Sequence, residues 1–368
     1  MNEKGVNILP MIGFSVLLLV FFTGLILFGK GGEKAGTDAK KDMGIINTYN
    51  IDESREISVT GKGRISIDAA STGVRINTHA DDSVKARLYG KVTTSVNNAV
   101  PVLELIEDGQ SAVVKIKYPE VYRFYYSENL KLDVTIPESW LNELDIRTVS
   151  GDVSAQVLSG SDIKLKSSSG DIKVQDITGN NITMETVSGN VDIDTVNGEN
   201  CIINSSSGDL QINKAVFSDS FRTKTVSGKC RINRLECKEA ELQASSGDIE
   251  IKDVVSESVK SKTVSGSITM KMKNGSAELE ASSGNIKAEF EEGFSSFRAK
   301  AVSGNVNLKL PENSEFSLDI KSVTGSIKCE GFPFSFNTSG DRRMTGAVGS
   351  GHGSVIISTS SGNITIGK

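Results

Sequence analysis

Apolar and polar residues alternate along most of the chain after residue 148, and a short phrase ending in Ser-Gly or Thr-Gly interrupts the alternation about every nineteen residues. Successive glycines of this phrase are 19, 19, 19, 20, 19, 19, 18, 20 and 21 residues apart, and a last gap of 37 follows. A fixed period of this length is typical of stacked-repeat proteins, whose units bury their apolar sides only against their neighbours. The glycines are Gly151, Gly170, Gly189, Gly208, Gly228, Gly247, Gly266, Gly284, Gly304, Gly325 and Gly362.

Four columns of mostly apolar residues appear when the repeats are aligned on their glycines. They lie two and four positions after the glycine and seven and five positions before it, with polar residues between them. This alternation at period two predicts short strands with one buried face. A further apolar column, seven positions after several glycines, predicts a coil with three sides. The first column consists of Val153, Ile172, Val191, Leu210, Cys230, Ile249, Ile268, Ile286, Val306, Ile327 and Ile364.

The pattern predicts an all-β protein, a parallel β-solenoid with about 19 residues per coil in which residue i pairs with residue i+19. We expect the repeat glycine to supply a positive φ angle at the corner of each coil. One column disagrees with this coil length, since Val149, Ser168 and Val187 begin a regular alternation of valine and serine two positions before the glycine. Like residues stack best on like, so a coil of about 38 residues stays open.

The first part of the chain predicts a membrane anchor. After a short tail (1–7), residues 8–28 form an uncharged apolar stretch that is long enough to cross a bilayer as one helix. Residues 29–44 are rich in glycine and charge and predict a flexible tether. More basic residues follow the apolar stretch than precede it, but large folded domains translocate largely regardless of charge. Charge therefore leaves the orientation open, as well as whether the segment is cleaved.

Between the tether and the repeats, residues 45–130 predict a β-rich entry region that caps the first coil. The solenoid repeats then occupy residues 131–368, with an irregular insertion near 330–353. A cap is expected because an uncovered solenoid end exposes both its core and its strand edges. The final strand, Asn363 to Ile366, would lie at the open end of the stack unless the insertion folds over it.

The densest aromatic group of the chain lies in the entry region and is the candidate binding patch. Clustered aromatic side chains can bind a sugar ring or a peptide, but they can equally form an apolar plug over the end of the stack. The group consists of Tyr118, Tyr122, Phe124, Tyr125 and Tyr126.

Composition excludes several other classes of function. A net charge of -5 with both signs interleaved gives no reason to expect nucleic acid as a partner. Cys201, Cys230 and Cys329 occupy apolar columns and are expected to be buried, whereas Cys237 falls outside them and could be exposed. The two histidines stand apart from each other and from the cysteines, so we expect no metal site and no cofactor.

A catalytic function is also disfavoured, because the sequence shows no cluster of acidic and basic residues on one outer face. Asp192, in the outward column three positions after the glycine, and Asp194, two residues further on, are the one acidic pair there, and no histidine or aromatic residue accompanies them. The position after the glycine is often Asp or Asn, but lysine and serine interrupt it, so turn propensity explains it better than calcium does. The segment 346–353 (GAVGSGHG) lacks the Lys-Ser/Thr ending of a phosphate loop and is expected to be a flexible cover.

Residues 132–137 (LDVTIP), 144–146 (LDI) and 148–152 (TVSGD), followed by alternating VSG and SSG copies and a closing SVIISTSSGNITI, resemble a bacterial family. The chain resembles the "putative adhesin" β-solenoid family of unknown function, and its predicted anchor makes it similar to LiaG-like membrane proteins. The resemblance covers about residues 45–368. It implies a right-handed β-helix outside the cytoplasmic membrane and an association with envelope stress, and it implies no catalytic residues.

These observations predict a single-pass membrane protein whose β-solenoid acts by binding or scaffolding in the cell envelope. Its expected partners are the membrane and either envelope proteins or cell-wall polymer. An adhesin or cell-wall polymer-binding protein is the main alternative. A polysaccharide-degrading enzyme is a third, less favoured hypothesis, because a β-helix can host such activity but needs converging acids and bases on one face. The ligand and the oligomeric state cannot be inferred.

Overall fold

The computed structural model describes residues 46–119 and 125–368. Within these residues the chain forms 25 strands and no helix, which confirms the predicted all-β class. Ile45 to Lys368 form one compact unit. The described part of the chain contains no helix long and apolar enough to span a membrane. The predicted anchor (8–28) and tether (29–44) lie outside the described residues.

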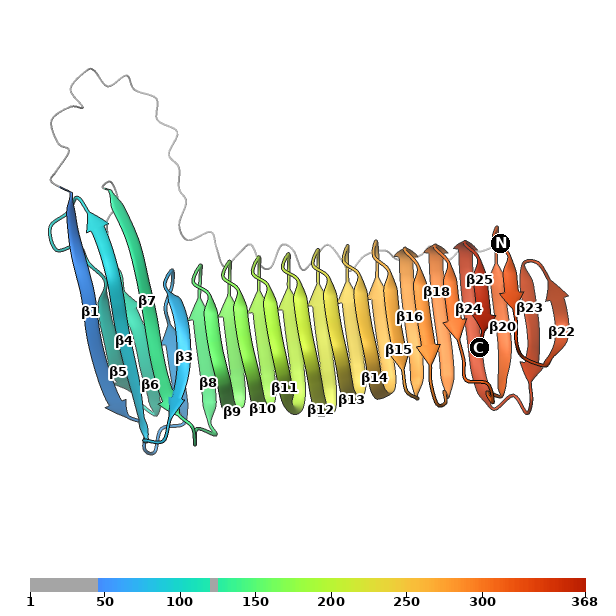
Figure 1. The fold of residues 1–368 in the computed structure, drawn as a ribbon, viewed down its shortest axis with the longest axis horizontal. Helices are drawn as coiled ribbons and strands as arrows, with labels where there is room; N and C mark the ends of the chain where they lie inside the picture. Colours follow the sequence, from blue (N-terminus) through green and yellow to red (C-terminus); the bar gives the residue numbers. More distant parts are fainter. Residues whose placement is uncertain (1–45, 120–124) are drawn as a thin grey trace, which may run out of the picture. The chain divides into compact units, whose positions relative to one another are not determined.

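Six long strands in the middle of the chain each run through most of one coil, and Figure 1 shows these coils side by side in sequence order. Each strand pairs in parallel with the next, with Ile172 opposite Val191 and Ile182 opposite Cys201. This offset of 19 residues confirms the predicted pairing, and the alternative of a 38-residue coil is wrong. The strands are β9 (Val153–Ser167), β10 (Ile172–Thr186), β11 (Val191–Ser205), β12 (Leu210–Thr225), β13 (Cys230–Ala244) and β14 (Ile249–Thr263).

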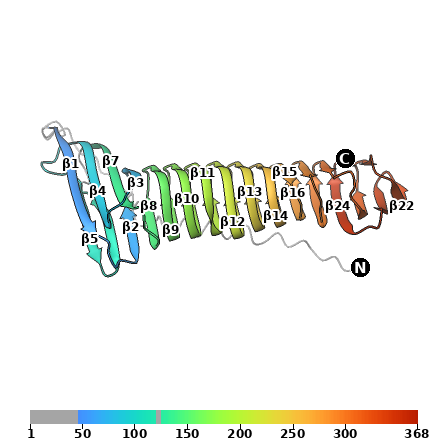
Figure 2. The same cartoon turned by 60° about the horizontal axis from the view of Figure 1, so that its bottom comes forward.

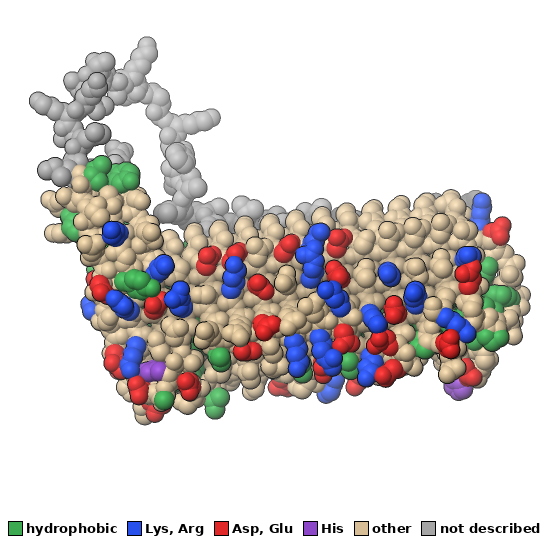
Figure 3. Space-filling model, viewed as in Figure 1, with side chains coloured by type: hydrophobic (Ala, Val, Ile, Leu, Met, Phe, Trp, Pro, Cys, Tyr) green, Lys and Arg blue, Asp and Glu red, His purple; other side chains and the backbone are tan. Residues whose placement is uncertain are grey.

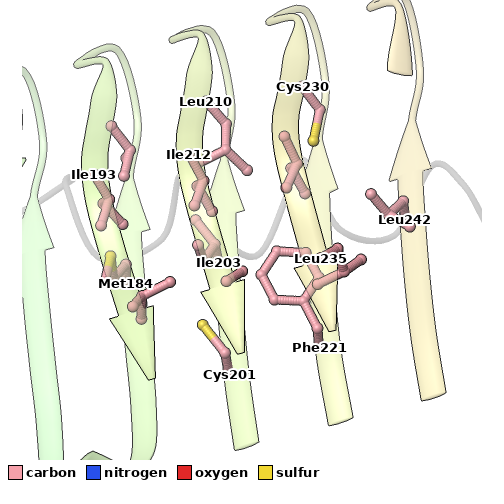
Figure 4. Close-up of a cluster of buried hydrophobic side chains, with 14 of the residues drawn as sticks. Met184, Ile193, Cys201, Ile203, Leu210, Ile212, Phe221, Cys230, Leu235 and Leu242 are labelled. Atoms are coloured by element: carbon pink, nitrogen blue, oxygen red, sulfur yellow. The ribbon is translucent and has the colours of Figure 1, made fainter. Parts of the chain in front are cut away.

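The inward side chains of successive coils form one continuous apolar core, part of which is shown in Figure 4. In β10, Ile172 and Val174 point inward, and the next inward residue, Ile177, follows after three positions instead of two. Pairing with β11 is interrupted close to this change, at Gln175, and again at Asn180. These two interruptions and the Ser-Gly turn divide each coil into three segments, as the third apolar column predicts.

The repeat glycines serve a different purpose from the one predicted. Their φ angles are not positive; in the described residues positive values belong to other positions, such as Gly275 with φ of 99°. Instead, a Cβ atom on Gly170 would stand less than 3 Å from the carbonyl oxygen of Gly151 in the preceding coil. The same overlap would occur in coil after coil, so glycine is required here because the turns of successive coils approach closely.

A column of buried hydroxyl groups supports most of these turns, and it was not recognised from the sequence. Three residues before the glycine, Thr186 accepts a hydrogen bond from the backbone N–H of Gly189 at 3.0 Å. Thr225 does the same for Gly228 at 3.1 Å. Alanine occupies this position at Ala244, where no hydroxyl is available. The hydroxyl satisfies a buried backbone donor that the tight turn leaves without a partner in the ladder.

In the later coils each long strand is split into two shorter ones. One ladder contains the strands before each Ser-Gly or Thr-Gly turn, and a second ladder contains the strands after it. The strands of this part of the chain, including the insertion strands β22 and β23, are β15 (Ile268–Met272), β16 (Ser276–Ser283), β17 (Ile286–Phe290), β18 (Ser296–Ser303), β19 (Val306–Lys309), β20 (Phe316–Ser322), β21 (Ile327–Cys329), β22 (Phe334–Gly340), β23 (Arg343–Val348), β24 (Gly353–Ser361) and β25 (Ile364–Gly367).

The last coil of the chain is not the last coil of the stack. Strand β24 pairs with β18 on one side and β20 on the other, and β25 lies between β19 and β21. The final strand is therefore enclosed, and the expectation that it could lie at the open end is wrong. The insertion instead covers β20, because β23 pairs antiparallel with β20 and β22 pairs antiparallel with β23. The glycine gap of 37 residues marks this exchange of order.

At the other end of the stack, strands of the entry region are also inserted out of sequence order. Strand β2 inserts between β6 and β8, and β3 inserts between β7 and β9, all in parallel. Antiparallel strands then close this end: β5 on β6, β4 on β7, and β1 on β4. Figures 1 and 2 show these longer strands at one end of the stack. The predicted boundary at residue 130 falls inside β7.

The strands of this end are β1 (Asn47–Ser58), β2 (Arg64–Asp68), β3 (Gly73–His79), β4 (Ser83–Thr94), β5 (Val102–Asp108), β6 (Ser111–Lys117), β7 (Tyr126–Pro137) and β8 (Glu143–Thr148).

The cysteines differ in part from the prediction. Cys201 and Cys230 are buried as expected, but Cys237 is also buried, with 8% of its surface exposed. It lies beside Ser256 in the next coil, at an inward position that Phe217 fills one coil earlier. Cys329 is only partly buried. All four thiols are free.

Candidate binding surface

The predicted aromatic patch divides into buried and exposed members. Tyr118 and Tyr126 are partly buried and pack against the core, whereas Tyr125 exposes 55% of its surface. Tyr122 and Phe124 lie outside the described residues. The structure therefore brings two of the five side chains into the packing of the entry region and leaves one available to a ligand.

Hydrogen bonds hold the two partly buried tyrosines in place. The Tyr118 hydroxyl donates to the carbonyl oxygen of Ala69 at 3.0 Å and lies 2.7 Å from the Thr72 hydroxyl. The Tyr126 hydroxyl donates to the Glu128 carboxylate at 2.8 Å. Burial raises the pKa of both phenols, and for Tyr126 the neighbouring Glu128 raises it further. These two rings support the entry region, and binding by the patch as a whole stays a prediction.

The column after the repeat glycine links the coils to one another. Asp152 Oδ1 accepts a hydrogen bond from the backbone N–H of Asp171 at 2.8 Å, and Asp171 does the same for Asn190. Asn190 in turn accepts from Asp209 at 2.9 Å. The short Asp and Asn side chains thus extend the ladder outside the turn, which explains why these residues recur there. The bonds continue at Lys229, Ser267, Asn285, Asn305, Asn363 and Ser326.

The described residues contain no cluster of side chains that could bind a metal ion. Among residues 46–119 and 125–368, no three His, Cys, Asp or Glu side chains come together in a metal-binding arrangement. The carboxylate of Asp194, one of the two acidic candidates, accepts a hydrogen bond from Asn213 at 2.8 Å in the next coil. Asp192 and Asp194 are both exposed on β11.

The outer faces of the stack carry interleaved charges of both signs, as Figure 3 shows for one face. Many oppositely charged side chains pair across neighbouring coils. Exposed pairs of this kind contribute little to stability, at most about 1 kcal/mol each. Because positive and negative side chains lie next to each other, this surface has no strong electrostatic potential of one sign. The pairs include Lys166 with Glu185 at 2.8 Å, Arg234 with Asp253 at 2.9 Å and Lys262 with Glu280 at 2.9 Å.

A groove of about 1100 Å³ opens at the corner where the last coils exchange order. The segment 310–315 must step over the coil of β24 and β25 to reach β20, and this step leaves the corner open. Phe290 and Leu310 lie at the apolar base of the groove, and five glutamates, His352 and Lys368 line it. The glutamates are Glu289, Glu291, Glu292, Glu312 and Glu315.

Much of the negative charge of this groove is already balanced. Lys271 pairs with Glu291 at 2.7 Å and with Glu289 at 3.6 Å, and Lys273 pairs with Glu292 at 3.2 Å. Hydrogen bonds from Ser350 lower the pKa of Glu315, and His352 adds to this effect. The sequence gives no sign of the groove, because it exists only when the final coil inserts out of order.

The segment 346–353 is part of this corner rather than a separate cover. Its first residues belong to β23, and the remainder forms a turn into β24. Gly349 and Gly351 have positive φ angles of 59° and 72°. The Ser350 hydroxyl bonds to the carboxylate of Glu315, which holds the turn against the segment 310–315.

The fold and the outer surface define a β-solenoid protein with capped ends. The chain belongs to the Toastrack DUF4097 family, whose model matches residues 63–220 and 199–367. This finding confirms the predicted resemblance to a family of "putative adhesin" β-solenoids, while the likeness to LiaG-like proteins stays a prediction. No curated protein matches the chain.

The chain also matches several solved structures of bacterial proteins. A "putative adhesin" from Parabacteroides distasonis is 15% identical, with 88% of this chain and 98% of that chain covered and a TM-score of 0.32. A "putative lipid binding protein" from the same organism is also 15% identical, with 85% and 96% covered and a TM-score of 0.36. A "putative cell adhesion protein" from Clostridium sporogenes is 11% identical, with 87% and 99% covered and a TM-score of 0.20. At these identities and scores, the names do not transfer to this chain.

Proposed function

We propose that this protein is a membrane-anchored component of the cell envelope whose right-handed β-solenoid acts by binding or scaffolding and not by catalysis. The observation that supports this proposal is the use of outer polar side chains in bonds between coils, as in the series Asp152, Asp171 and Asn190. Groups held in this way form a regular surface suited to contact. The uncharged stretch 8–28 supports the anchor.

An association with envelope stress is the finer form of this proposal and rests on the likeness to LiaG-like proteins. Its test is crosslinking in intact cells that produce the full chain, followed by capture through a tag and identification of the captured proteins. Recovery of envelope or sensor proteins, dependent on residues 8–28, would support it. Recovery of none above the level of an untagged strain would contradict it.

The side of the membrane is tested separately by protease treatment of intact cells. If residues 46–368 lie outside the cytoplasm, as we propose, the repeat region is lost from intact cells while a cytoplasmic control protein survives. Digestion only after lysis would place the repeats in the cytoplasm. Because a stacked β-structure can resist proteases, a cleavage site placed in the segment 29–44 serves as the matched positive control.

An adhesin or cell-wall polymer-binding protein is the second candidate, and the exposure of Tyr125 favours it. An exposed tyrosine ring offers apolar area with a polar end and is common in binding surfaces. Retention of the full chain on isolated wall material, reduced by Tyr125→Ser but not by Tyr89→Ser, would support this candidate. Equal elution of the wild type and both variants would remove it.

A further inference from the structure

The dipeptide Asn-Gly occurs twice in the chain, and its two copies have different surroundings. Asn197 and Gly198 belong to β11, where both residues pair with the coil before and with the coil after. Asn274 and Gly275 lie in the short connection between β15 and β16, outside the strands. The fold therefore holds one copy inside the ladder and places the other in a turn.

Asn-Gly is the dipeptide in which the main chain most easily attacks an asparagine side chain. The backbone nitrogen of the glycine gives up its proton to a base and forms a bond with the side-chain carbonyl carbon of the asparagine. The side-chain amide nitrogen leaves as ammonia, and a cyclic imide remains. Water then opens the imide at either carbonyl, which gives aspartate or isoaspartate. Glycine favours the attack because it has no Cβ to obstruct its nitrogen.

The turn at Asn274 meets the requirements of this reaction. The Asn274 side chain is exposed to the water that opens the imide. Within the described residues, the N–H of Gly275 donates to no acceptor, so no hydrogen bond has to break before its nitrogen attacks. At Asn197 the same movement would disrupt pairing on both sides of β11. Backbone held in this way opens only rarely.

We propose that Asn274 is a site of spontaneous deamidation in the folded protein and that Asn197 is protected from it. Both products carry a carboxylate in place of the neutral amide. Isoaspartate also carries the main chain through the former side chain, which adds one carbon atom to the path of the backbone. The modification is irreversible without a repair enzyme, so the modified fraction grows with the age of the protein.

This turn supports one wall of the groove of about 1100 Å³. The carbonyl oxygen of Lys273 accepts a hydrogen bond from the backbone N–H of Glu292 at 2.9 Å. The carbonyl oxygen of Gly275 accepts one from Ser295, also at 2.9 Å. Isoaspartate in the turn places an extra main-chain carbon between these two carbonyl groups, so both bonds cannot keep their present geometry. Formation of isoaspartate therefore loosens the segment 291–295, which lines the groove.

Timed incubation of the purified full chain tests the proposal. The protein is kept at mildly alkaline pH, in native buffer and in concentrated urea, and its peptides are analysed by mass spectrometry. In native buffer we expect deamidation of the peptide that contains Asn274, while the peptide that contains Asn197 keeps its mass. In urea both peptides should react at similar rates, because the ladder no longer protects Asn197. An unmodified Asn274 in native buffer, or equal rates at both sites there, would overturn the proposal.

Two variants separate the extra main-chain carbon from the added charge. Asn274→Gln slows the reaction because its imide ring would be larger, and freshly prepared Asn274→Asp supplies the carboxylate alone. After incubation, the backbone amides of 291–295 should exchange with deuterium faster in the wild type and at an unchanged rate in Asn274→Gln. Fresh Asn274→Asp should match the fresh wild type. Unchanged exchange in wild-type protein that contains isoaspartate at this position would overturn the effect on the groove.

Discussion

The Cα of Gly170 faces the carbonyl oxygen of Gly151 so closely that a Cβ atom on Gly170 would stand less than 3 Å from that oxygen. The same relationship joins Gly170 to Gly189 and Gly189 to Gly208. The repeated glycine is therefore a condition for stacking one turn on the next. It also explains why the period of the sequence matches the period of the structure.

Replacing one of these repeat glycines with alanine should lower the stability of the fold. The same replacement at a glycine with open space around its Cα should have little effect. Gly208→Ala forces the turn away from Gly189, and overpacking of this kind costs about 1–3 kcal/mol. Gly293→Ala is the matched control, because nothing lies within 4 Å of the added methyl group. Denaturant unfolding should show a lower midpoint for the first variant only. Equal midpoints would mean that the turns are not closely packed.

The buried hydroxyl column predicts opposite effects at two positions. Thr186→Val keeps the shape of the side chain but leaves the N–H of Gly189 without its acceptor, which costs about 1–3 kcal/mol. Ala244→Ser supplies the missing acceptor for Gly247 and should stabilise the protein by about 0.5–1.5 kcal/mol. Melting temperatures of both variants provide the measurement. A destabilised Ala244→Ser variant would count against the role assigned to the column.

The buried thiols predict a loss of stability at alkaline pH. Burial raises the pKa of Cys230 to about 12 and that of Cys237 to about 11. In the unfolded chain a thiol ionises near its ordinary value of about 8.5. Between these values the folded state keeps a proton that the unfolded state loses, so the free energy of unfolding falls as pH rises. The fall is on the order of 1 kcal/mol per pH unit for each thiol.

Unfolding of the wild type at pH 8 and pH 10 measures this effect, with Cys230→Val as the control. The variant should lose less stability over this interval, because one of the titrating groups is gone. An identical loss in both proteins would show that Cys230 does not contribute. Rapid alkylation of Cys230 in the native protein at pH 8 would contradict its burial.

The enclosed position of the last coil predicts unusual protection of the end of the chain. Residues of β24 pair on both sides, so their backbone amides should exchange with deuterium as slowly as those of β18. Within the described residues, β22 pairs on one side only, so its amides should exchange much faster. Hydrogen exchange followed by mass spectrometry distinguishes the two. Fast exchange throughout 353–361 would contradict the inserted order.

The sequence predicts the regular part of this fold well, because the apolar columns and the period carry the information directly. Val153, Ile172 and Val191 occupy equivalent inward positions, as their common distance from the glycine predicts. The sequence does not reveal the function of the repeat glycine, since close approach and a positive φ both require glycine. The distinction depends on the atoms of the neighbouring coil.

The ends of the stack were harder to predict for a different reason. Local pattern identifies β2 and β24 as strands but not the coils between which they insert, since that order depends on contacts between distant parts of the chain. The groove lined by Glu312 and Glu315 follows from this order and was missed for the same reason. For Tyr118 and Tyr126 the sequence reveals only that aromatic residues cluster. Their partial burial depends on the packing of the entry region.

The most direct test of the stacked coil is a distance between two outward residues several repeats apart. Spin labels at Lys173 and Lys287, both exposed, are separated by six coils, because residues 173, 192, 211, 231, 250, 269 and 287 pair in turn. With about 4.8 Å between neighbouring strands, the expected backbone separation is about 29 Å. A double electron–electron resonance distance centred near this value would support the account. A distance near half of it, as a 38-residue coil requires, would contradict it.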